Sequence, residues 1–442
     1  MTHSNLHSFI LLVALTTAIE PAYAQQPPDI VNSDLYGNTA SGTSALLNVQ
    51  AGSGGTANDA FGQYALMSNT TGNDNTAVGT EALMGNTTGY FNTAIGSKAL
   101  FSNTIGNENT ASGSGALQLN TTGTSNTATG NNALFSNTTG NLNTAFGKDA
   151  LTDNGIGYSN TAVGGFALAT NTTGYYNTAV GQDALLVNTT GANNTAFGNL
   201  ALQSNTTGKG NAAQGVNSLF NNTTGIRNLG IGSNALYTNS TGSYNIALGF
   251  DAGYNVANGS NNIEIGASGT ASDNGTIQIG VQGTQTSTMI AGIFGTPVSG
   301  SAVYVTSTGQ LGVQASSERF KTDVATMPEL SGKLAQLRPV TFHYRTDPKS
   351  VQQYGLIAEE VDRVYPELVI RDGAGRIQGV HYEELAPMLL SEMQRQQQIN
   401  AAQTEMIEVQ AAEMRDLKRQ VAELNDLKQE MHAALREMQR KE

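Results

Sequence analysis

Six of the thirteen acidic side chains before residue 316 are candidates for chemistry, because paired carboxylates are the groups that cleave sugar chains on long repetitive proteins. The six are Asp74, Glu81, Glu108, Asp149, Asp183 and Asp251. Hydrolysis of a glycosidic bond needs two carboxylates at a fixed separation, one acting as acid and one as nucleophile or base. Because these six are scattered over different positions of a repeating unit, we interpret them as surface charges.

A second pattern places Ser316 five residues before Lys321. A lysine can take the proton of a serine hydroxyl only when burial lowers its pKa, and the spacing alone carries little information. His343 and His381 lie in the same region, and we interpret both as packed residues. The chain has no cysteine, so these histidines are too few for a metal site, and we expect neither metal nor cofactor.

The dominant feature of the chain is a run of asparagines at a strict spacing of 17 residues. They are Asn58, Asn75, Asn92, Asn109, Asn126, Asn143, Asn160, Asn177, Asn194, Asn211, Asn228, Asn245 and Asn262. Each opens a version of N-T-A-x-G-x-x-A-L-x-x-N-T-T-G-x-x. A short fixed period without slippage indicates one structural unit stacked on copies of itself.

The repeating unit suits one coil of a parallel β-solenoid, a β-roll. Thr, Val and Ile favour strands, while Asn-Thr-Thr-Gly favours a turn because Asn and Gly tolerate positive φ. Seventeen residues are too few for a helix, a strand and two turns, so we expect two short strands in each coil. Coils about 4.8 Å apart would form a rod of roughly 60 Å.

The core of such a rod is thin, which favours an oligomer. The third position of the unit is mostly Ala, as in Ala77 and Ala94. The fourth is mostly apolar: Phe61, Val78, Ile95, Phe146, Val163, Phe197 and Ile231. Neighbouring strand residues face opposite ways, so one face closes on its own coil and the other requires a neighbouring subunit. We expect a homotrimer.

The repeat decays at both ends. Asn38 to Gly42 is out of step by three residues, and Thr276 to Gly280 follows the last unit after only fourteen. Over residues 38–280 the rod resembles the β-roll heads of trimeric autotransporter adhesins, although the usual period of those heads is shorter than 17.

Charge and the N-terminus limit the function classes. The net charge is −13, and 17 of the 21 Lys and Arg residues follow residue 315, so no basic stripe along the repeats predicts nucleic-acid binding. Phe9 to Ala18 is a short apolar run before the A-x-A motif Ala22–Ala24, which predicts a secretory signal peptide over residues 1–24. No later segment is apolar enough to cross a membrane. We therefore expect an exported protein, extracellular or on the cell surface.

The last third of the chain reads as a small α+β module. We expect a helix over residues 328–337, a strand over 339–345, a strand leading into a helix over 354–361, a strand over 366–370 and a return strand over 377–382. Its motifs are S-x-x-R-x-K at Ser316, Arg319 and Lys321, L-x-P-V-x-F at 337–342, G-L-I-A-E-E-V at 355–361, P-E-L-V at 366–369 and V-H-Y-E-E-L at 380–385. Over residues 316–395 these resemble the C-terminal intramolecular chaperone of phage tail fibres and endosialidases, a self-cleaving serine peptidase domain.

The resemblance implies a mechanism. Ser316 would attack the carbonyl of Ala315, and Lys321 would accept the serine proton, so the chain would be cut between Ala315 and Ser316. Arg319 would support the site. Members of the family usually carry Asp after the serine, whereas Ser317 stands there and is a competing nucleophile. A module that folds without cutting is the alternative.

A heptad pattern follows within a long helix that begins after Tyr382. The a and d positions are Met414, Leu417, Val421, Leu424, Lys428, Met431, Leu435 and Met438, with Asn400 also at an a position. This pattern predicts a coiled coil.

We thus predict a mainly β protein with the following organisation: signal peptide 1–24, N-terminal cap 25–57, solenoid 58–285, neck 286–315, chaperone and autoprotease 316–395, and coiled coil 396–442. The favoured function is an exported homotrimeric surface fibre or adhesin with a cell-surface or glycan ligand. The alternatives are a prophage tail fibre or spike with the same chaperone, and a glycan-acting or ice-binding solenoid.

Overall fold

The computed structural model describes residues 32–49, 54–291, 299, 301–306, 308–328, 331–345 and 351–440. The predicted signal peptide, residues 1–24, lies outside these ranges. The chain divides into two compact units, one of residues 1–300 and 305–310 and the other of residues 301–304 and 311–442. Within the described ranges, no helix combines the length and the apolar composition needed to span a membrane.

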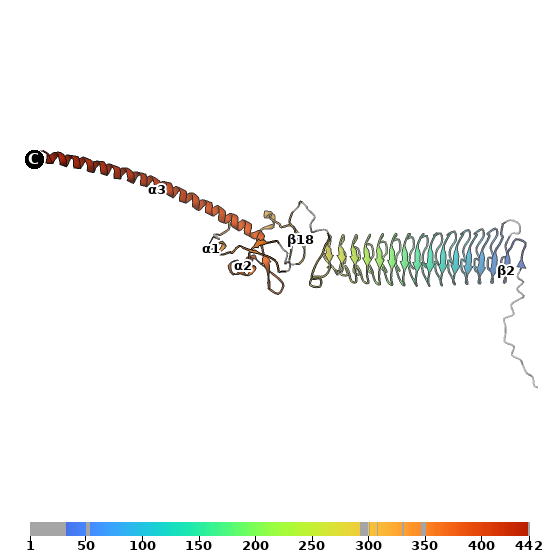
Figure 1. Ribbon diagram of the computed structural model, residues 1–442. Helices are drawn as coiled ribbons and strands as arrows, with labels where there is room; N and C mark the ends of the chain where they lie inside the picture. Colours follow the sequence, from blue (N-terminus) through green and yellow to red (C-terminus); the bar gives the residue numbers. More distant parts are fainter. Residues whose placement is uncertain are drawn as a thin grey trace, which may run out of the picture. The chain divides into compact units, whose positions relative to one another are not determined.

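The first unit is the predicted parallel solenoid, drawn in Figure 1 as a regular stack of coils. Its sixteen-stranded sheet consists of β1 (Asn32–Ser33), β2 (Thr39–Ser41), β3 (Asp59–Phe61), β4 (Thr76–Val78), β5 (Thr93–Ile95), β6 (Thr110–Ser112), β7 (Thr127–Thr129), β8 (Thr144–Phe146), β9 (Thr161–Val163), β10 (Thr178–Val180), β11 (Thr195–Phe197), β12 (Ala212–Gln214), β13 (Leu229–Ile231), β14 (Ile246–Leu248), β15 (Ile263–Ile265) and β16 (Ile277–Ile279).

Each coil contributes one strand rather than the two that we expected. Strands from successive repeats pair in parallel with equivalent residues side by side, as Ala145 does with Ala162. The rest of the coil turns too often to form a second strand.

The tight turning comes from backbone in the left-handed region. The seventh, ninth and last residues of most units have φ near +50° to +60°, as at Asp149, Leu151 and Ser159. Such a conformation costs roughly 1–2 kcal/mol for a residue with a side chain. At the ninth position the turn directs a leucine into the core, and complete burial of a leucine contributes about 1.5–3 kcal/mol.

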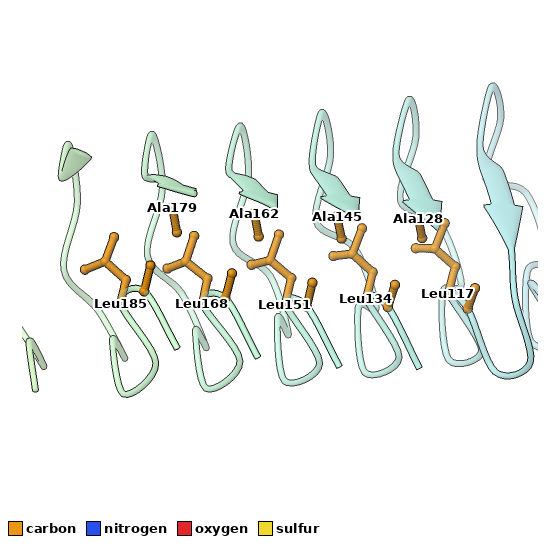
Figure 2. Close-up of a cluster of buried hydrophobic side chains, with 14 of the residues drawn as sticks. Leu117, Ala128, Leu134, Ala145, Leu151, Ala162, Leu168, Ala179 and Leu185 are labelled. Carbon is orange, nitrogen blue, oxygen red and sulfur yellow. The ribbon is translucent and has the colours of Figure 1, made fainter. Parts of the chain in front are cut away.

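The core of the solenoid is a double row of small and branched side chains. The alanine in the middle of each strand and the alanine–leucine pair at positions eight and nine are fully buried, as with Ala145, Ala150 and Leu151. Figure 2 shows the leucines of successive coils in one row, facing the strand alanines of the opposite wall. Small side chains suit the strand position that faces the leucine row, which explains why the third position is alanine in most units.

Two continuous rows of buried asparagines join the coils. In the first row, Asn143 donates from its backbone N–H (3.0 Å) and from Nδ2 (3.2 Å) to Oδ1 of Asn126, and from Nδ2 to the carbonyl oxygen of Gly157 (2.8 Å). In the second row, Asn137 donates from Nδ2 to Oδ1 of Asn120 (2.8 Å) and to the carbonyl oxygen of Gly140 (3.0 Å). The second row comes from the Asn-Thr-Thr-Gly turns, so these asparagines join neighbouring coils as well as shaping turns.

The first coil closes the N-terminal end with a longer loop. Asn38 lies twenty residues before Asn58, yet its Oδ1 accepts hydrogen bonds from the backbone N–H and Nδ2 of Asn58 at 3.0 Å. The asparagine row therefore continues through the segment that is out of step in the sequence. The short strand β1 pairs antiparallel with β2 and covers the edge of the sheet.

At the C-terminal end of the solenoid, the row of strand alanines and the row of turn asparagines are both interrupted. Val256 replaces the turn asparagine and Glu264 replaces the strand alanine, and both are fully buried. The carboxylate oxygens of Glu264 have no hydrogen-bond partner among the described residues. Burial, with a smaller contribution from the charge of Asp273, raises the pKa of Glu264 to about 7.

The second unit begins with small elements and ends in one long helix. They are β17 (Tyr304–Val305), β18 (Leu311–Gly312), the 3-10 turn η1 (Glu318–Phe320), α1 (Ser331–Leu334), β19 (Val340–Phe342), β20 (Gln353–Gly355), α2 (Ala358–Val364), the 3-10 turn η2 (Pro366–Leu368), β21 (Val369–Arg371), β22 (Ile377–Val380) and α3 (Tyr382–Gln439). The strand that we expected over residues 366–370 is instead a turn followed by a strand, because proline favours the first position of a helical turn.

Replacing Asn143 with alanine tests the asparagine rows. The change removes the acceptor of the Asn160 backbone N–H and side chain, and the donor to Gly157. Buried groups left unpaired cost about 1–3 kcal/mol each, so we expect a total loss of about 2–5 kcal/mol. A lower denaturant midpoint would report the loss. The exposed Thr139→Ala is the control, with an expected change below about 0.5 kcal/mol. Equal midpoints for the two variants would contradict the assignment.

The pKa of Glu264 predicts a pH dependence of solenoid stability. Because the pKa is raised above its ordinary value of 4.5 to about 7, the native state binds more protons than the unfolded chain between these values. Stability from this group is therefore lost as pH rises from about 4.5 to 7. Glu264→Ala, which restores the repeat residue, should raise the thermal midpoint more at pH 8 than at pH 4.5. An equal gain at both pH values would refute the burial effect.

Candidate functional site at the start of the C-terminal module

The structure brings Ser316 and Lys321 together. The Nζ atom of Lys321 lies 3.4 Å from Oγ of Ser316, within the range of a long hydrogen bond. This is the pair that sequence analysis singled out as nucleophile and base. The peptide bond between Ala315 and Ser316, where we predict cleavage, belongs to the same residue as the serine hydroxyl.

A single turn of 3-10 helix creates the approach. The carbonyl oxygen of Ser317 accepts a hydrogen bond from the N–H of Phe320 (3.0 Å), and that of Glu318 accepts one from the N–H of Lys321 (2.9 Å). The turn η1 folds the chain back within five residues. Without it, five residues of extended chain would separate the two Cα atoms by about 17 Å.

The single chain leaves the pair in solvent. Ala315, Ser316 and Lys321 are all exposed. A lysine becomes an effective base at neutral pH when burial disfavours its charged form. The geometry for proton transfer is therefore present, but the burial that would make the lysine an effective base must come from elsewhere.

Arg319 and Ser317 flank the pair without joining it. The guanidinium of Arg319 stacks over the ring of Phe320, with 4.6 Å between its central carbon and the ring centroid. Ser317 lies at the N-terminal cap of η1, and its side chain forms no capping hydrogen bond. The structure thus gives Arg319 a packing contact rather than a contact with the serine or lysine.

The body of the module packs around α2 and the β21–β22 hairpin. Its buried residues are Val361, Tyr365, Leu368, Val369, Val380 and Met388. Met388 comes from α3, so the first turns of the long helix belong to this core. The apolar residues of the P-E-L-V motif fill the centre of the module, which gives that motif a packing role.

Gly355 is required by the close approach of Tyr382. The hydroxyl of Tyr382 accepts a hydrogen bond from the N–H of Leu356 (2.8 Å). A Cβ atom on Gly355 would lie only 2.6 Å from that hydroxyl oxygen, so any larger residue would displace the tyrosine. This contact joins β20 to the first residue of α3, and the sequence alone did not reveal it.

An ion pair ties the segment before β19 to α2. Arg338 donates two hydrogen bonds to the carboxylate of Glu360, from Nε (3.1 Å) and from Nη2 (2.5 Å). These hydrogen bonds hold the pKa of Glu360 below its ordinary value. Paired hydrogen bonds of this kind fix orientation as well as distance, so they align α2 with the segment that leads into β19.

Neither histidine of the module contacts the Ser316–Lys321 pair. His381 is half-buried, its backbone N–H donates to the carbonyl oxygen of Leu368 (2.9 Å), and its Nδ1 lies 2.9 Å from the carboxylate of Glu383. His343 follows the end of β19 and is exposed, rather than packed as we expected.

The six acidic residues considered as candidate carboxylates occupy left-handed corners of the solenoid. Sequence analysis described them as scattered, but all six have positive φ between 52° and 62°, at only two positions of the coil. Asp149 accepts a hydrogen bond from Asn132, Asp251 accepts one from Asn234, and Glu81 pairs with Lys98. Aspartate tolerates this backbone region better than most residues, which explains part of their placement.

Among the described residues, nowhere do three or more His, Cys, Asp or Glu side chains gather as a metal ion would require.

A comparison with known families identifies the module. Residues 316–370 match the family model described as chaperone of endosialidase, peptidase family S74. The matched segment begins at Ser316 and ends within β21. A comparison with curated proteins found no match for the chain. The second unit therefore carries a chaperone-of-endosialidase domain, preceded in the chain by the β-solenoid.

Proposed function

We propose that the chain is an exported homotrimeric fibre whose C-terminal chaperone domain assembles three copies and then cuts each chain between Ala315 and Ser316. A chaperone-of-endosialidase domain behind a repetitive solenoid fits a protein of the phage-tail-fibre type. The observation that carries the cleavage is the 3.4 Å approach of Lys321 Nζ to Ser316 Oγ at the first matched residue.

The proposed cleavage consumes one water molecule. Lys321 accepts the hydroxyl proton of Ser316, and Oγ attacks the carbonyl carbon of Ala315. The peptide C–N bond breaks, an ester bond to Oγ forms, and the leaving nitrogen takes a proton to become the new amino terminus. Water then hydrolyses the ester to the carboxylate of Ala315 and the free hydroxyl of Ser316. Ser317 is the alternative nucleophile.

Two apolar surfaces support the association of copies. On the solenoid, the fourth residue of most units is apolar and faces outward, and several of these side chains are exposed, for example Ile95 and Phe146. On α3, the a and d residues from Met414 to Met438 are exposed, including Leu417 and Leu424. A parallel coiled coil would bury the a and d residues of α3 and hold the copies in the same axial register.

Assembly also supplies what the cleavage site lacks. Ser316 and Lys321 are exposed in one chain, so packing of neighbouring copies over them would provide the desolvation that a lysine base needs. Cleavage would then follow trimer formation and not precede it. The cut releases the chaperone and leaves an assembled solenoid that unfolds slowly, because unfolding requires separation of three chains.

The fibre has two candidate settings. The predicted signal peptide favours a surface fibre or adhesin that contacts a cell-surface or glycan ligand. The family match equally accommodates a prophage tail fibre or spike. Detection of the protein outside the cell, with residues 1–24 removed, supports the first setting. Retention until lysis supports the second. A glycan-acting or ice-binding solenoid remains a third alternative, addressed by hydrolysis and ice-recrystallisation assays.

Cleavage predicts a defined fragment. Expression of the full chain should yield a C-terminal product beginning at Ser316 with 127 residues, which is 442 − 315. Ser316→Ala and Lys321→Ala should remain full length, because each removes one partner of the proton transfer. Mass spectrometry of the products measures the outcome.

The matched control for cleavage is Ser317→Ala, which should cut normally. If wild type and both dyad variants run at full length, the module is a chaperone without peptidase activity. If Ser316→Ala still cuts while Ser317→Ala does not, Ser317 is the nucleophile.

The coiled coil predicts a second outcome. In the full chain with Ser316→Ala, Leu417→Asp with Leu424→Asp should convert trimers to monomers, because charges at d positions would be buried unpaired. Arg415→Asp with Ala422→Asp, at b positions in the same heptads, should leave the trimer intact. Sedimentation measures both. A trimer that survives the d-position changes would show that α3 does not hold the copies together.

A further inference from the structure

The outward face of the solenoid sheet changes character along its length. Each strand presents two outward residues, its first and its third, while the middle residue points into the core. In β4–β11 the first of these is threonine in every strand. In β13–β16 both are aliphatic: Leu229 and Ile231, Ile246 and Leu248, Ile263 and Ile265, Ile277 and Ile279. We name these eight residues the aliphatic patch.

The aliphatic patch is accessible on the single chain. Ile265 is 37% exposed, Ile277 66% and Ile279 72%. In β3–β16, Asp59 alone among the outward strand residues is charged. Apart from the buried Glu264, the other charged residues between residues 54 and 285 lie outside the strands, as Glu81 and Lys98 do at corners of the coil. A face that excludes charge and concentrates aliphatic residues at one end is suited to another apolar face.

The size of the face fits association with copies of the chain. Three residues span about 10 Å and fourteen strands about 4.8 Å apart span roughly 60 Å, which gives a flat area of roughly 600 Å². Stable interfaces use about 800 Å² from each partner. Corrugation by side chains brings the face close to that value, so the face is large enough to contribute to an interface between copies.

We propose that the aliphatic patch is where the solenoids of three copies first meet, and that pairing then extends toward the N-terminus. This inference rests on the proposed trimer. The patch is the part of the solenoid nearest in sequence to the chaperone domain, separated from Ser316 by 36 residues after Ile279. Copies gathered by the chaperone would thus bring their most apolar coils together before the threonine-lined coils.

The third residue of each strand, which faces outward, also specifies the register between copies. Polar residues interrupt its apolar row at Ser112, Thr129 and Gln214. In-register copies place each interruption beside its own equivalent. A slip of one coil would place Gln214 beside Ile231 or Phe197 and bury an amide against aliphatic or aromatic groups. Because the polar interruptions are unequally spaced along the face, those of neighbouring copies coincide in only one register. The asparagine rows are the same in every coil and therefore favour no register.

The test compares two triple variants of the full chain. Leu229→Thr, Ile246→Thr and Ile263→Thr place in the patch the residue that eight other coils carry, so the coils themselves should still form. Val78→Thr, Val163→Thr and Val180→Thr remove as many outward apolar residues from other coils. Trimer formation on refolding, followed by sedimentation, should slow at least tenfold in the first variant and less than threefold in the second.

A second measurement does not depend on folding rates. Because the chain lacks cysteine, Ile263→Cys introduces one thiol on the outward face, and Thr241→Cys introduces one in an exposed turn. Oxidised trimers should contain disulfide-linked pairs only with Ile263→Cys. If wild type trimerises but the triple variants slow equally, or if only Thr241→Cys links, the patch inference is wrong. If wild type remains monomeric, the proposed trimer itself fails.

Discussion

The hydrogen bonds between buried asparagine amides are the constraint on which the solenoid depends. An amide is both donor and acceptor, so a row continues only where the next coil places asparagine at the same point. Asn126 and Asn143 show the pattern on one wall, and Asn120 and Asn137 on the other. An insertion that moved an asparagine out of its row would leave buried amides unpaired, at about 1–3 kcal/mol each. That penalty explains why asparagine recurs at the same point of every coil, and Asn38 keeps its place in the row although 20 residues separate it from Asn58.

The same amide rows bear on the proposed association of copies. Their hydrogen bonds pair the buried polar groups of the interior, where alanine and leucine leave no room for larger groups. They do not cover the apolar residues on the outer face of the sheet. They also repeat identically, so they cannot distinguish one coil from the next. Correct alignment of several copies therefore requires information from outside the rows. The outward strand residues vary from coil to coil, and the C-terminal module occurs once, so these parts of the chain can carry that information.

Sequence reasoning reached the architecture because the period is visible in the residues themselves. The thirteen asparagines, the buried alanines and the outward fourth position follow from periodicity and strand alternation. It failed where three-dimensional contact decides. The second expected strand of each coil is replaced by left-handed corners, and leucine at φ near +52° contradicts its ordinary preference. The contact of Tyr382 with Gly355 joins residues 27 apart, and nothing in their spacing announces it.

The candidate site was found by motif, and its geometry adds a condition that the motif does not contain. Ser316 and Lys321 are close enough to exchange a proton, yet both are exposed. In the proposed cleavage, a site that cuts its own chain should act only after assembly, and the exposure of both side chains in one chain fits that requirement because a lysine base needs burial. Burial by neighbouring copies would then act as the signal that assembly is complete. The proposal thus places folding first, association second and cleavage last.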